Sequence, residues 1–330
     1  MRFCLIFLCL ILFSCTTKEE SSKTLFTKLN SKTTHIDFKN EITNTKDLNI
    51  FKYRNFYNGG GVAIGDINND GLSDVFFSAN IKKNKLYLNQ GDFKFQDITE
   101  KASIEGINNW STGVVMVDIN ADGWLDIYVC NAGNVKGDNR KNELYINNKD
   151  LTFTESAEQY NLADDGFTTH ATFFDYDKDG DLDVYILNNS FIPVSSLGYS
   201  NKRNLRSKDW DIPEMLKGGG DKLLKNVNGK FVDVSEDAGI YGSLIGFGLG
   251  VSVGDVNNDS WPDLYISNDF YERDYLYINN KNGTFSEDIK KWTSHISLSS
   301  MGSDIGDINN DGLPEVFTTD MLPEDNARLK

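Results

Sequence analysis

A nine-residue acidic pattern occurs five times in the chain and constrains its fold more than any other feature. It reads DINNDGLSD from Asp66, DINADGWLD from Asp118, DYDKDGDLD from Asp175, DVNNDSWPD from Asp255 and DINNDGLPE from Asp307. The first aspartates are spaced by 52, 57, 80 and 52 residues. Recurrence at a nearly fixed period indicates a tandem array of structural units, here with one insertion before the fourth copy.

The form of the pattern, D-x-[ND]-x-D-[GS]-x-x-[DE], predicts a site for a hard cation. Calcium takes about six to eight oxygen ligands from carboxylates, amide oxygens, backbone carbonyls and water. Side chains at loop positions 1, 3, 5 and 9 supply such oxygens, and position 7 offers its backbone carbonyl. We therefore predict about five structural calcium ions, and the alternative is that the loops are bare turns. The predicted ligand residues are Asp66, Asn68, Asp70, Leu72 and Asp74; Asp118, Asn120, Asp122, Trp124 and Asp126; Asp175, Asp177, Asp179, Asp181 and Asp183; Asp255, Asn257, Asp259, Trp261 and Asp263; and Asp307, Asn309, Asp311, Leu313 and Glu315.

An EF-hand begins with the same loop, but it needs a bidentate glutamate at position 12 and a helix on each side. Position 12 is occupied by Phe77, Val129, Ile186, Ile266 and Thr318 in the five copies. The EF-hand is therefore excluded.

The segments around each loop predict β-strands. Short runs rich in Val, Ile, Tyr and Phe flank the loops, as in GVVMV before and DIYVCN after the second copy. Two more strands around an Asn/Gly/Asp turn follow, as in NELYINNKDLTFTESA. A unit of four short antiparallel strands repeated about every 52 residues predicts an all-β fold, a β-propeller with about five visible blades.

Over roughly residues 25–320 these features resemble the FG-GAP or VCBS-type repeats, the calcium-loop propellers of integrin alpha-chain heads and many bacterial secreted proteins. The stretch FGLGVSVGDVNNDSWPDLYISN, Phe247 to Asn268, carries the Phe-Gly pair and the loop in the family's order, although Ser260 replaces the usual glycine and Glu315 the last aspartate. LYLNQGDFKFQDITEKASI and KFVDVSEDAGI resemble bacterial surface proteins that combine such repeats with an ASPIC/UnbV domain. The resemblance implies further repeats and such a domain, and nothing in this sequence resembles that domain.

The charge distribution supports cation binding. The chain has 49 acidic and 33 basic residues, for a net charge of −16. The five loops contain 17 of the acids and one lysine, which leaves 32 acids and 32 bases elsewhere. The acidic excess therefore lies in the loops, and nucleic acid is not expected as a partner because phosphate binding needs basic patches.

The N-terminus resembles a bacterial lipoprotein signal. MRFCLIFLCLILFSC has a basic Arg2 and an apolar core too short to span a bilayer. We expect a signal peptide over residues 1–14, lipid on Cys15 and a flexible tether over 15–24. The chain would then be exported and anchored to the outer membrane, and Lys18-Glu19-Glu20 predicts a position on its outer face, at the cell surface. An ordinary signal peptide or an uncleaved anchor is the alternative.

Three further features bear on function. Cys130 is the one cysteine outside the signal and lipid positions, and its strand context predicts a buried residue. His170 lies five residues before Asp175, where the other repeats have glycine, so its side chain is a candidate to reach a central channel; packing is the alternative. The insertion over about 191–217 gathers Lys202, Arg203, Arg206 and Trp210 as candidate ligand contacts, or forms a merely solvated excursion.

The end of the repeat array is open to two interpretations. The fifth copy is followed only by EVFTTDMLPEDNARLK, with residues 321–330 expected as a tail or linker. Either Phe26–Phe38, which resembles an outer strand, completes the last blade, or the chain is part of a longer protein.

These features favour a calcium-binding, lipid-anchored extracellular module that binds a glycan or a protein partner. A polysaccharide-acting enzyme on the same propeller is the second hypothesis, and an assembly scaffold is the third. The sequence contains no G-x-S-x-G, H-E-x-x-H or P-loop motif.

Overall fold

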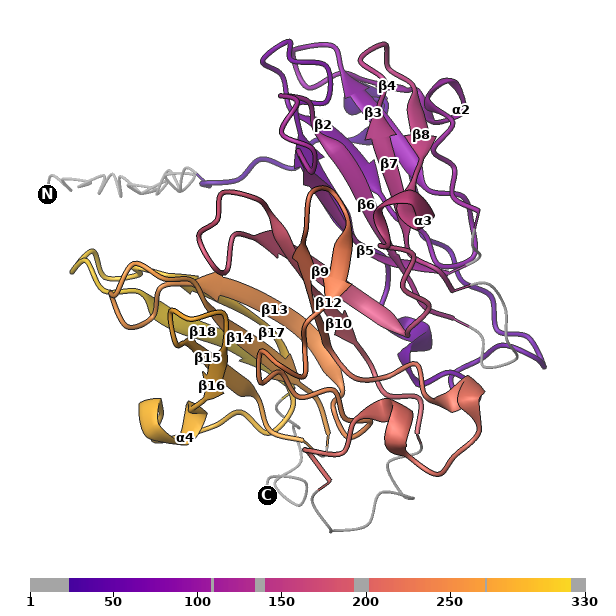
Figure 1. Cartoon of the computed structure of the whole chain (residues 1–330). Coiled ribbons are helices and arrows are strands. Elements are labelled where there is room, and N and C mark those ends of the chain that lie inside the picture. The colour runs from indigo at the N-terminus through magenta and orange to yellow at the C-terminus, as the bar shows by residue number, and fades with distance from the viewer. Residues whose placement is uncertain (1–23, 108–109, 134–139, 193–201, 271, 322–330) are drawn as a thin grey trace, which may run out of the picture.

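The computed structural model describes residues 24–107, 110–133, 140–192, 202–270 and 272–321 (Figure 1). These residues form five antiparallel sheets, of which the first four have four strands each and the fifth has two. The predicted all-β architecture of four-stranded antiparallel blades is confirmed. The signal peptide, Cys15 and all of the expected tail except Met321 lie outside the described residues.

Strands within each sheet follow one another in chain order. The first sheet contains β1 (Val62–Gly65), β2 (Asp74–Phe77), β3 (Lys85–Asn89) and β4 (Phe95–Asp97); the second β5 (Ser111–Val117), β6 (Asp126–Asn131), β7 (Glu143–Asn147) and β8 (Phe153–Glu155); the third β9 (Thr168–Phe174), β10 (Asp183–Asn188), β11 (Lys222–Asn226) and β12 (Phe231–Asp233); the fourth β13 (Gly248–Gly254), β14 (Asp263–Asn268), β15 (Tyr275–Asn279) and β16 (Phe285–Glu287); and the fifth β17 (Ser300–Gly306) and β18 (Glu315–Asp320). Each acidic loop joins the first two strands of its blade.

Helices are short and lie between the strands. They are α1 (Ser31–Thr34), η1 (Arg54–Tyr57), α2 (Thr99–Ala102), α3 (Ala157–Tyr160), η3 (Ser207–Asp209), η4 (Glu214–Leu216) and α4 (Ile289–Trp292). None of the helices in the described part of the chain has the length and apolarity needed to cross a bilayer.

The blades are arranged so that their first strands are neighbours. β1 contacts β5, β5 contacts β9, β9 contacts β13, and β13 contacts β17. Hydroxyl groups join successive first strands: Thr112 Oγ1 donates to the carbonyl of Thr168 (2.6 Å), and Thr169 Oγ1 donates to the carbonyl of Gly248 (2.9 Å). The first strands therefore form the inner wall of the propeller.

The hydrophobic core consists of layers between neighbouring blades. One layer contains Phe76 and Leu86 from the first blade with Val114 and Ile127 from the second, and equivalent layers join the second to the third and the third to the fourth. Because they have a blade on each side, β6, β10 and β14 are buried at every residue. β18, which has the equivalent place in the fifth blade, has no fully buried residue.

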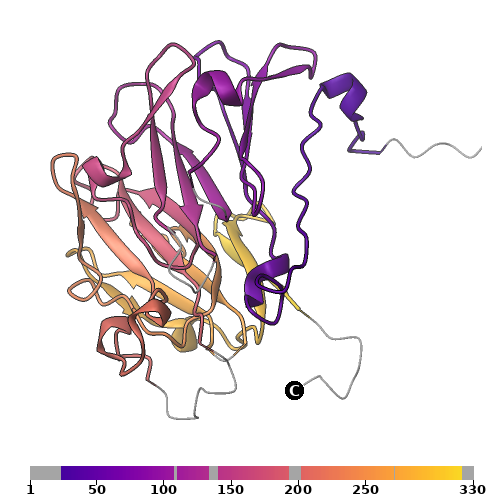
Figure 2. The ribbon, with the colours of Figure 1, turned by 90° about the vertical axis from the view of Figure 1, so that its right-hand side faces the viewer.

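The N-terminal segment packs against the first blade instead of completing the fifth. The ring of Phe38 stacks on Phe77 at 4.8 Å between centroids, and Asp37 accepts a hydrogen bond from the Tyr87 hydroxyl (3.0 Å). In Figure 2 this indigo segment runs beside the first blade down to η1. Phe26–Phe38 therefore does not form the ring-closing strand. The stretch contains α1, and its last two residues contact β2 and β3 of the first blade.

Candidate functional site

Each acidic loop is ordered by the carboxylate at its first position. In the first loop, Asp66 Oδ1 accepts from the backbone N–H of Asp70 (3.2 Å), and Oδ2 accepts from that of Gly71 (2.7 Å). The same two bonds recur in the other four loops. Position 6 has φ of 84° at Gly71 and 68° at Ser260, so Ser260 adopts a left-handed conformation that favours glycine. Local turn chemistry therefore builds the loops.

The carboxylate at position 9 is buried under the third strand of its blade. In the second blade Asp126 is 0 % exposed and accepts from the backbone N–H groups of Ile119 (3.2 Å) and Asn147 (2.8 Å). Burial, with a smaller contribution from nearby loop carboxylates, raises the pKa of Asp126 to about 6. The pKa of Asp183 rises to about 7 and that of Asp263 to about 6 for the same reasons. A cation in the loop would favour the charged form of these buried groups.

An asparagine at the end of each third strand fastens the loop, and the sequence interpretation missed this role. The Asn147 side-chain amide donates to the carbonyls of Leu125 (3.0 Å) in its own blade and Ile67 (2.8 Å) in the preceding blade. Asn279 repeats the arrangement with Pro262 (3.2 Å) and Tyr176 (2.8 Å). The recurrent LYLN, LYIN and LLKN endings were the available signal, but they were interpreted only as strands.

The third loop gathers the most negative charge. Carboxylate oxygens of Asp175, Asp177 and Asp183 lie within 4.8 Å of one another, the one such group of three acids in the described residues. Asp177 Oδ1 is buried and has no hydrogen-bond partner, while its other oxygen pairs with Lys225, which also lies 3.1 Å from Asp179 Oδ2. An unsatisfied buried carboxylate oxygen among three converging acids fits the oxygen-rich coordination that calcium prefers.

The fifth loop differs from the other four. Glu315 Oε1 accepts from the Asn309 side-chain amide (2.7 Å), and Glu315 Oε2 accepts from the backbone N–H of Ile308 (2.8 Å). This blade has only two strands among the described residues, and within them no third-strand asparagine bonds to the loop. The predicted position-3 and position-9 ligands therefore bond to each other in a more exposed loop.

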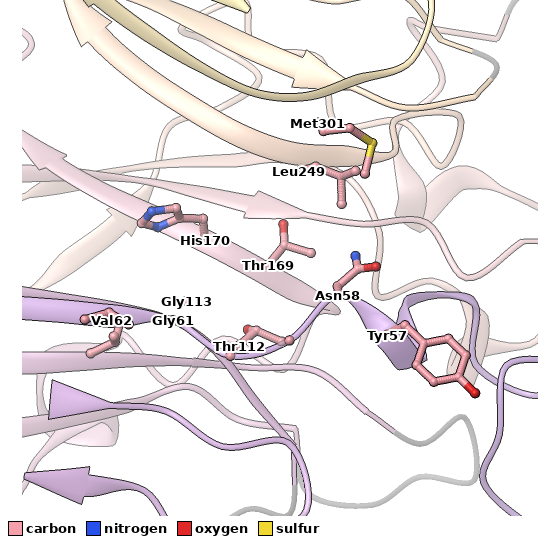
Figure 3. A pocket seen from close by; sticks show the side chains of 13 residues that line it. Tyr57, Asn58, Gly61, Val62, Thr112, Gly113, Thr169, His170, Leu249 and Met301 are labelled. Carbon is pink, nitrogen blue, oxygen red and sulfur yellow. The ribbon is translucent and has the colours of Figure 1, made fainter. Parts of the chain in front are cut away.

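A cavity of about 410 Å³ lies where the first strands of all five blades meet (Figure 3). Register shifts in four of these strands fall at cavity-lining residues: Thr112 and Gly113, Thr169, Leu249 and Met301. An extra residue in a strand re-aims its side chain. These irregularities therefore determine the groups that face the axis.

His170 lines this cavity at the position that is glycine in the other repeats. The strands approach closely here. A Cβ added at Gly113 would lie only 2.7 Å from the carbonyl oxygen of Thr169, so this position requires glycine. His170 Nδ1 accepts from the backbone N–H of Ala171 (2.8 Å), so the neutral ring carries its hydrogen on Nε2. Burial lowers the pKa of His170, which favours this neutral form.

A family model for the FG-GAP-like repeat matches residues 66–129, 132–186 and 255–318, more than half of the chain. The chain belongs to the FG-GAP-like repeat family. The matched segments contain all five acidic loops, so the resemblance seen in the sequence is confirmed.

Relatives of this FG-GAP protein include cartilage acidic protein 1 from Xenopus tropicalis, which is 32 % identical over 215 residues, covering 64 % of this chain and 29 % of the relative. The Mus musculus protein of the same name is 29 % identical over 135 residues, covering 39 % of this chain and 20 % of the relative. The chain therefore spans less than a third of the length of these relatives.

Similar solved structures include an Agrocybe aegerita lectin that recognises non-reducing terminal N-acetylglucosamine, with a TM-score of 0.40 and 15 % identity over 77 % of this chain and 59 % of that one. A Bacillus licheniformis rhamnogalacturonan lyase has a TM-score of 0.37 and 11 % identity over 79 % of this chain and 55 % of that one. These similarities are remote, and no ligand is transferred from them.

The insertion of this FG-GAP chain is attached to the fourth blade by the cations considered as ligand contacts. Arg203 forms an ion pair with buried Glu272, with Nε 2.8 Å from Oε1, and Arg206 Nη1 donates to the carbonyl of Ile240 (3.1 Å). Lys202 Nζ lies 5.0 Å from the ring centroid of Trp210. The four side chains come from one segment, but both arginines are engaged in holding it. Residues 193–201 of the insertion lie outside the described part.

Two further side chains pack within the propeller. Cys130 is a free thiol with 0 % exposure in β6, as predicted, and burial raises the pKa of its thiol. Trp261 in the fourth loop lies under Lys178 of the third loop, with Nζ 4.9 Å from the ring centroid. This contact joins neighbouring blades of the propeller.

Proposed function

We propose that this protein is a calcium-stabilised, lipid-anchored extracellular propeller that binds a glycan or a protein partner. The observation that carries the calcium part is the third loop, where the unpartnered Asp177 oxygen lies among three converging carboxylates. The family membership supports a binding module. The anchor on Cys15 and the location at the outer membrane rest on the sequence.

Calcium would supply positive charge to groups that are costly to bury alone. The first four loops each contain a fully buried aspartate at position 9 together with less buried acids at positions 1 and 5. At free calcium ten times the dissociation constant, each site would contribute about 1.4 kcal/mol to the free energy of unfolding. About five sites would contribute roughly 7 kcal/mol, which is comparable with the stability of a whole domain.

The test is a count of bound calcium by native mass spectrometry, together with thermal unfolding in excess calcium and in chelator. We expect a stoichiometry near five, with the fifth loop weakest, and a large fall in the melting temperature on chelation. Asp177→Ala should lose one ion, whereas Asp177→Asn should retain it, since the other four loops have asparagine at position 3. An unchanged melt with no bound metal would refute the calcium part.

The axial cavity is the proposed contact site for the partner. Its lining consists of one imidazole, one phenol and otherwise glycine, hydroxyl, amide, thioether and aliphatic groups. This composition favours recognition of a neutral ligand over acid-base chemistry on a polysaccharide, since such chemistry needs an acid and a base that converge on the reacting atoms.

A glycan array and a panel of extracellular proteins, probed with the calcium-loaded chain, would identify the partner. His170→Gly introduces the residue that the other repeats have at this position, and we expect it to weaken binding at least tenfold. Lys202→Ala in the insertion serves as the comparison. If Lys202→Ala abolishes binding and His170→Gly leaves it unchanged, the contact site is the insertion and not the cavity.

A further inference from the structure

We propose that a lysine from the outer part of the blade sets the calcium affinity of the second, third and fourth acidic loops. The first loop, which has glycine in place of this lysine, then fills before the second and fourth loops. The inference rests on the calcium part of the proposed function. It assigns a role to Lys149, Lys225 and Lys281, which lie outside the nine-residue pattern.

In the second and fourth blades the lysine comes from the turn after the third strand. Lys149 Nζ lies 3.3 Å from Asp122 Oδ2, and Lys281 Nζ lies 3.2 Å from Asp259 Oδ2. Both acids are at loop position 5, and their Oδ1 atoms accept from the backbone N–H of position 7, at 3.0 Å and 2.9 Å. The lysine therefore takes the carboxylate oxygen that the loop leaves available to a cation.

The third blade places a lysine at the same acid from a different position in the chain. Lys225 belongs to β11, and its Nζ lies 3.1 Å from Oδ2 of Asp179, again at position 5. It also pairs with Asp177 at position 3. The third loop contains five aspartates, compared with three in the second and in the fourth. One lysine therefore offsets a smaller share of the loop charge in the third blade.

The first blade shows the loop without this lysine. Gly91 has the position of Lys149 and Lys281, since the backbone N–H of all three donates to the side-chain oxygen of the asparagine that ends the third strand. Asp70 Oδ2 accepts instead from the Asn68 side-chain amide (3.0 Å), which is a neutral donor. The first loop therefore keeps more net negative charge than the second, although both contain three acids.

A lysine beside a loop lowers the calcium affinity in two ways. It stabilises the empty loop by pairing with an acid, and its charge repels an incoming cation. The Lys149 side chain is 45 % exposed, so solvent and salt screen part of this effect. We expect each lysine to raise the calcium dissociation constant of its loop by about three- to tenfold.

The experiment is a titration with free calcium, in which native mass spectrometry counts the ions bound by the chain without its lipid cysteine. Lys149→Met should move one of the later binding steps to about three- to tenfold lower free calcium, whereas Lys149→Arg should leave it in place. Lys141→Met is the matched control, because Lys141 precedes β7 and pairs with Glu158, at the end of the strand away from the loop. It removes the same charge and should leave every step unchanged.

Gly91→Lys transfers the lysine to the first blade. The φ of 83° at Gly91 is close to the 67° at Lys149 and the 63° at Lys281, and a Cβ at Gly91 would meet no atom within 4 Å. One of the earliest binding steps should move to about three- to tenfold higher free calcium. Gly91→Ala has the same backbone cost without the charge, and it should leave that step in place.

Thermal unfolding distinguishes this role from a merely structural one. In chelator, Lys149→Met should melt at a lower temperature than the unaltered chain, because Asp122 loses its partner. At free calcium near the dissociation constant it should melt at a higher temperature, because the second loop binds calcium more tightly. A lysine that only supports the fold would lower the melting temperature in both conditions.

The outcomes separate this inference from the calcium proposal on which it rests. If the unaltered chain binds calcium but Lys149→Met and Gly91→Lys leave all binding steps in place, the inference is overturned and the calcium sites stand. The same holds if Lys149→Met moves its step to higher free calcium. An unaltered chain that binds no calcium would overturn both.

Discussion

Replacing Asp221 with asparagine should stabilise the protein at neutral and alkaline pH. Asp221 lies directly before β11 and is 5 % exposed. It accepts hydrogen bonds from the Tyr185 hydroxyl (2.8 Å) and the backbone N–H of Asn188 (3.0 Å). Burial raises the pKa of this carboxyl to about 7, above its usual 3.8. Folding therefore opposes ionisation of Asp221. This lowers the free energy of unfolding progressively as the pH rises from about 4 toward 7.

The second blade shows that an amide fits this position. Asn142 accepts from the backbone N–H of Asn131 (2.7 Å) and donates to the Tyr128 hydroxyl (2.9 Å). The Tyr128 hydroxyl itself donates a hydrogen bond to the carbonyl of Leu162 (3.0 Å). An asparagine at position 221 can repeat the first two bonds, but the Tyr185 hydroxyl would lose Asp221 Oδ2 as its acceptor.

The magnitude follows from the pKa difference. A rise of about 3 pKa units corresponds to about 4 kcal/mol, an upper figure for the cost of the ionised form above pH 7. Loss of the acceptor for the Tyr185 hydroxyl subtracts about 1 to 2 kcal/mol. We therefore expect Asp221→Asn to raise the free energy of unfolding by about 2 kcal/mol at pH 8. The gain should shrink as the pH falls from 7 toward 4, where Asp221 is protonated in both states.

Urea denaturation at several pH values between 5 and 8 in constant excess calcium provides the assay, and the difference between variant and unaltered chain isolates this group. The reverse substitution Asn142→Asp should destabilise the protein at pH 8 and less at pH 5. If Asp221→Asn lowers the midpoint at pH 8, or if its effect does not change with pH, the burial argument is wrong.

Three further predictions concern the loop, the axis and the anchor. Asn147→Ala should lower the free energy of unfolding by about 2 kcal/mol in urea titrations, because it leaves two carbonyls without the amide that fastens the second loop, whereas Asn148→Ala on the exposed turn should have little effect. Gly113→Ala should destabilise by at least about 2 kcal/mol, since its Cβ would lie 2.9 Å from Cα of His170, while Gly306→Ala meets no atom within 4 Å and should change the melting temperature little. Cys15→Ala should abolish labelling by fatty acid and release the protein from the membrane fraction; continued labelling would refute lipid attachment at this residue.

Much of the fold could be predicted from the sequence because the relevant interactions are local. The aspartate at position 1 bonds to backbone groups four and five residues later, as between Asp66 and Gly71, so the loop is encoded in nine consecutive residues. Strand identity follows from short runs of β-branched and aromatic residues. Together with these strands, the repeat period predicted a four-stranded blade. The position of Cys130 within a predicted strand indicated that its side chain is buried.

The roles that the sequence did not reveal depend on contacts between segments far apart in the chain. The Asn147 side chain donates to a carbonyl 80 residues earlier in the chain. Arg203 forms its ion pair with Glu272, which lies 69 residues later. Strand register and blade order decide these contacts, and neither is fixed by local turn chemistry.

The sequence by itself therefore determined the repeat, the acidic loops and the strands, since each depends on neighbours along the chain. Only the tertiary structure decided that position 9 is buried, that His170 faces the axial cavity, and that Lys149 pairs with the acidic loop of its blade. Burial of one side chain depends on which blade lies beside it, and identical motifs such as DINNDGL have different surroundings in the first and fifth blades.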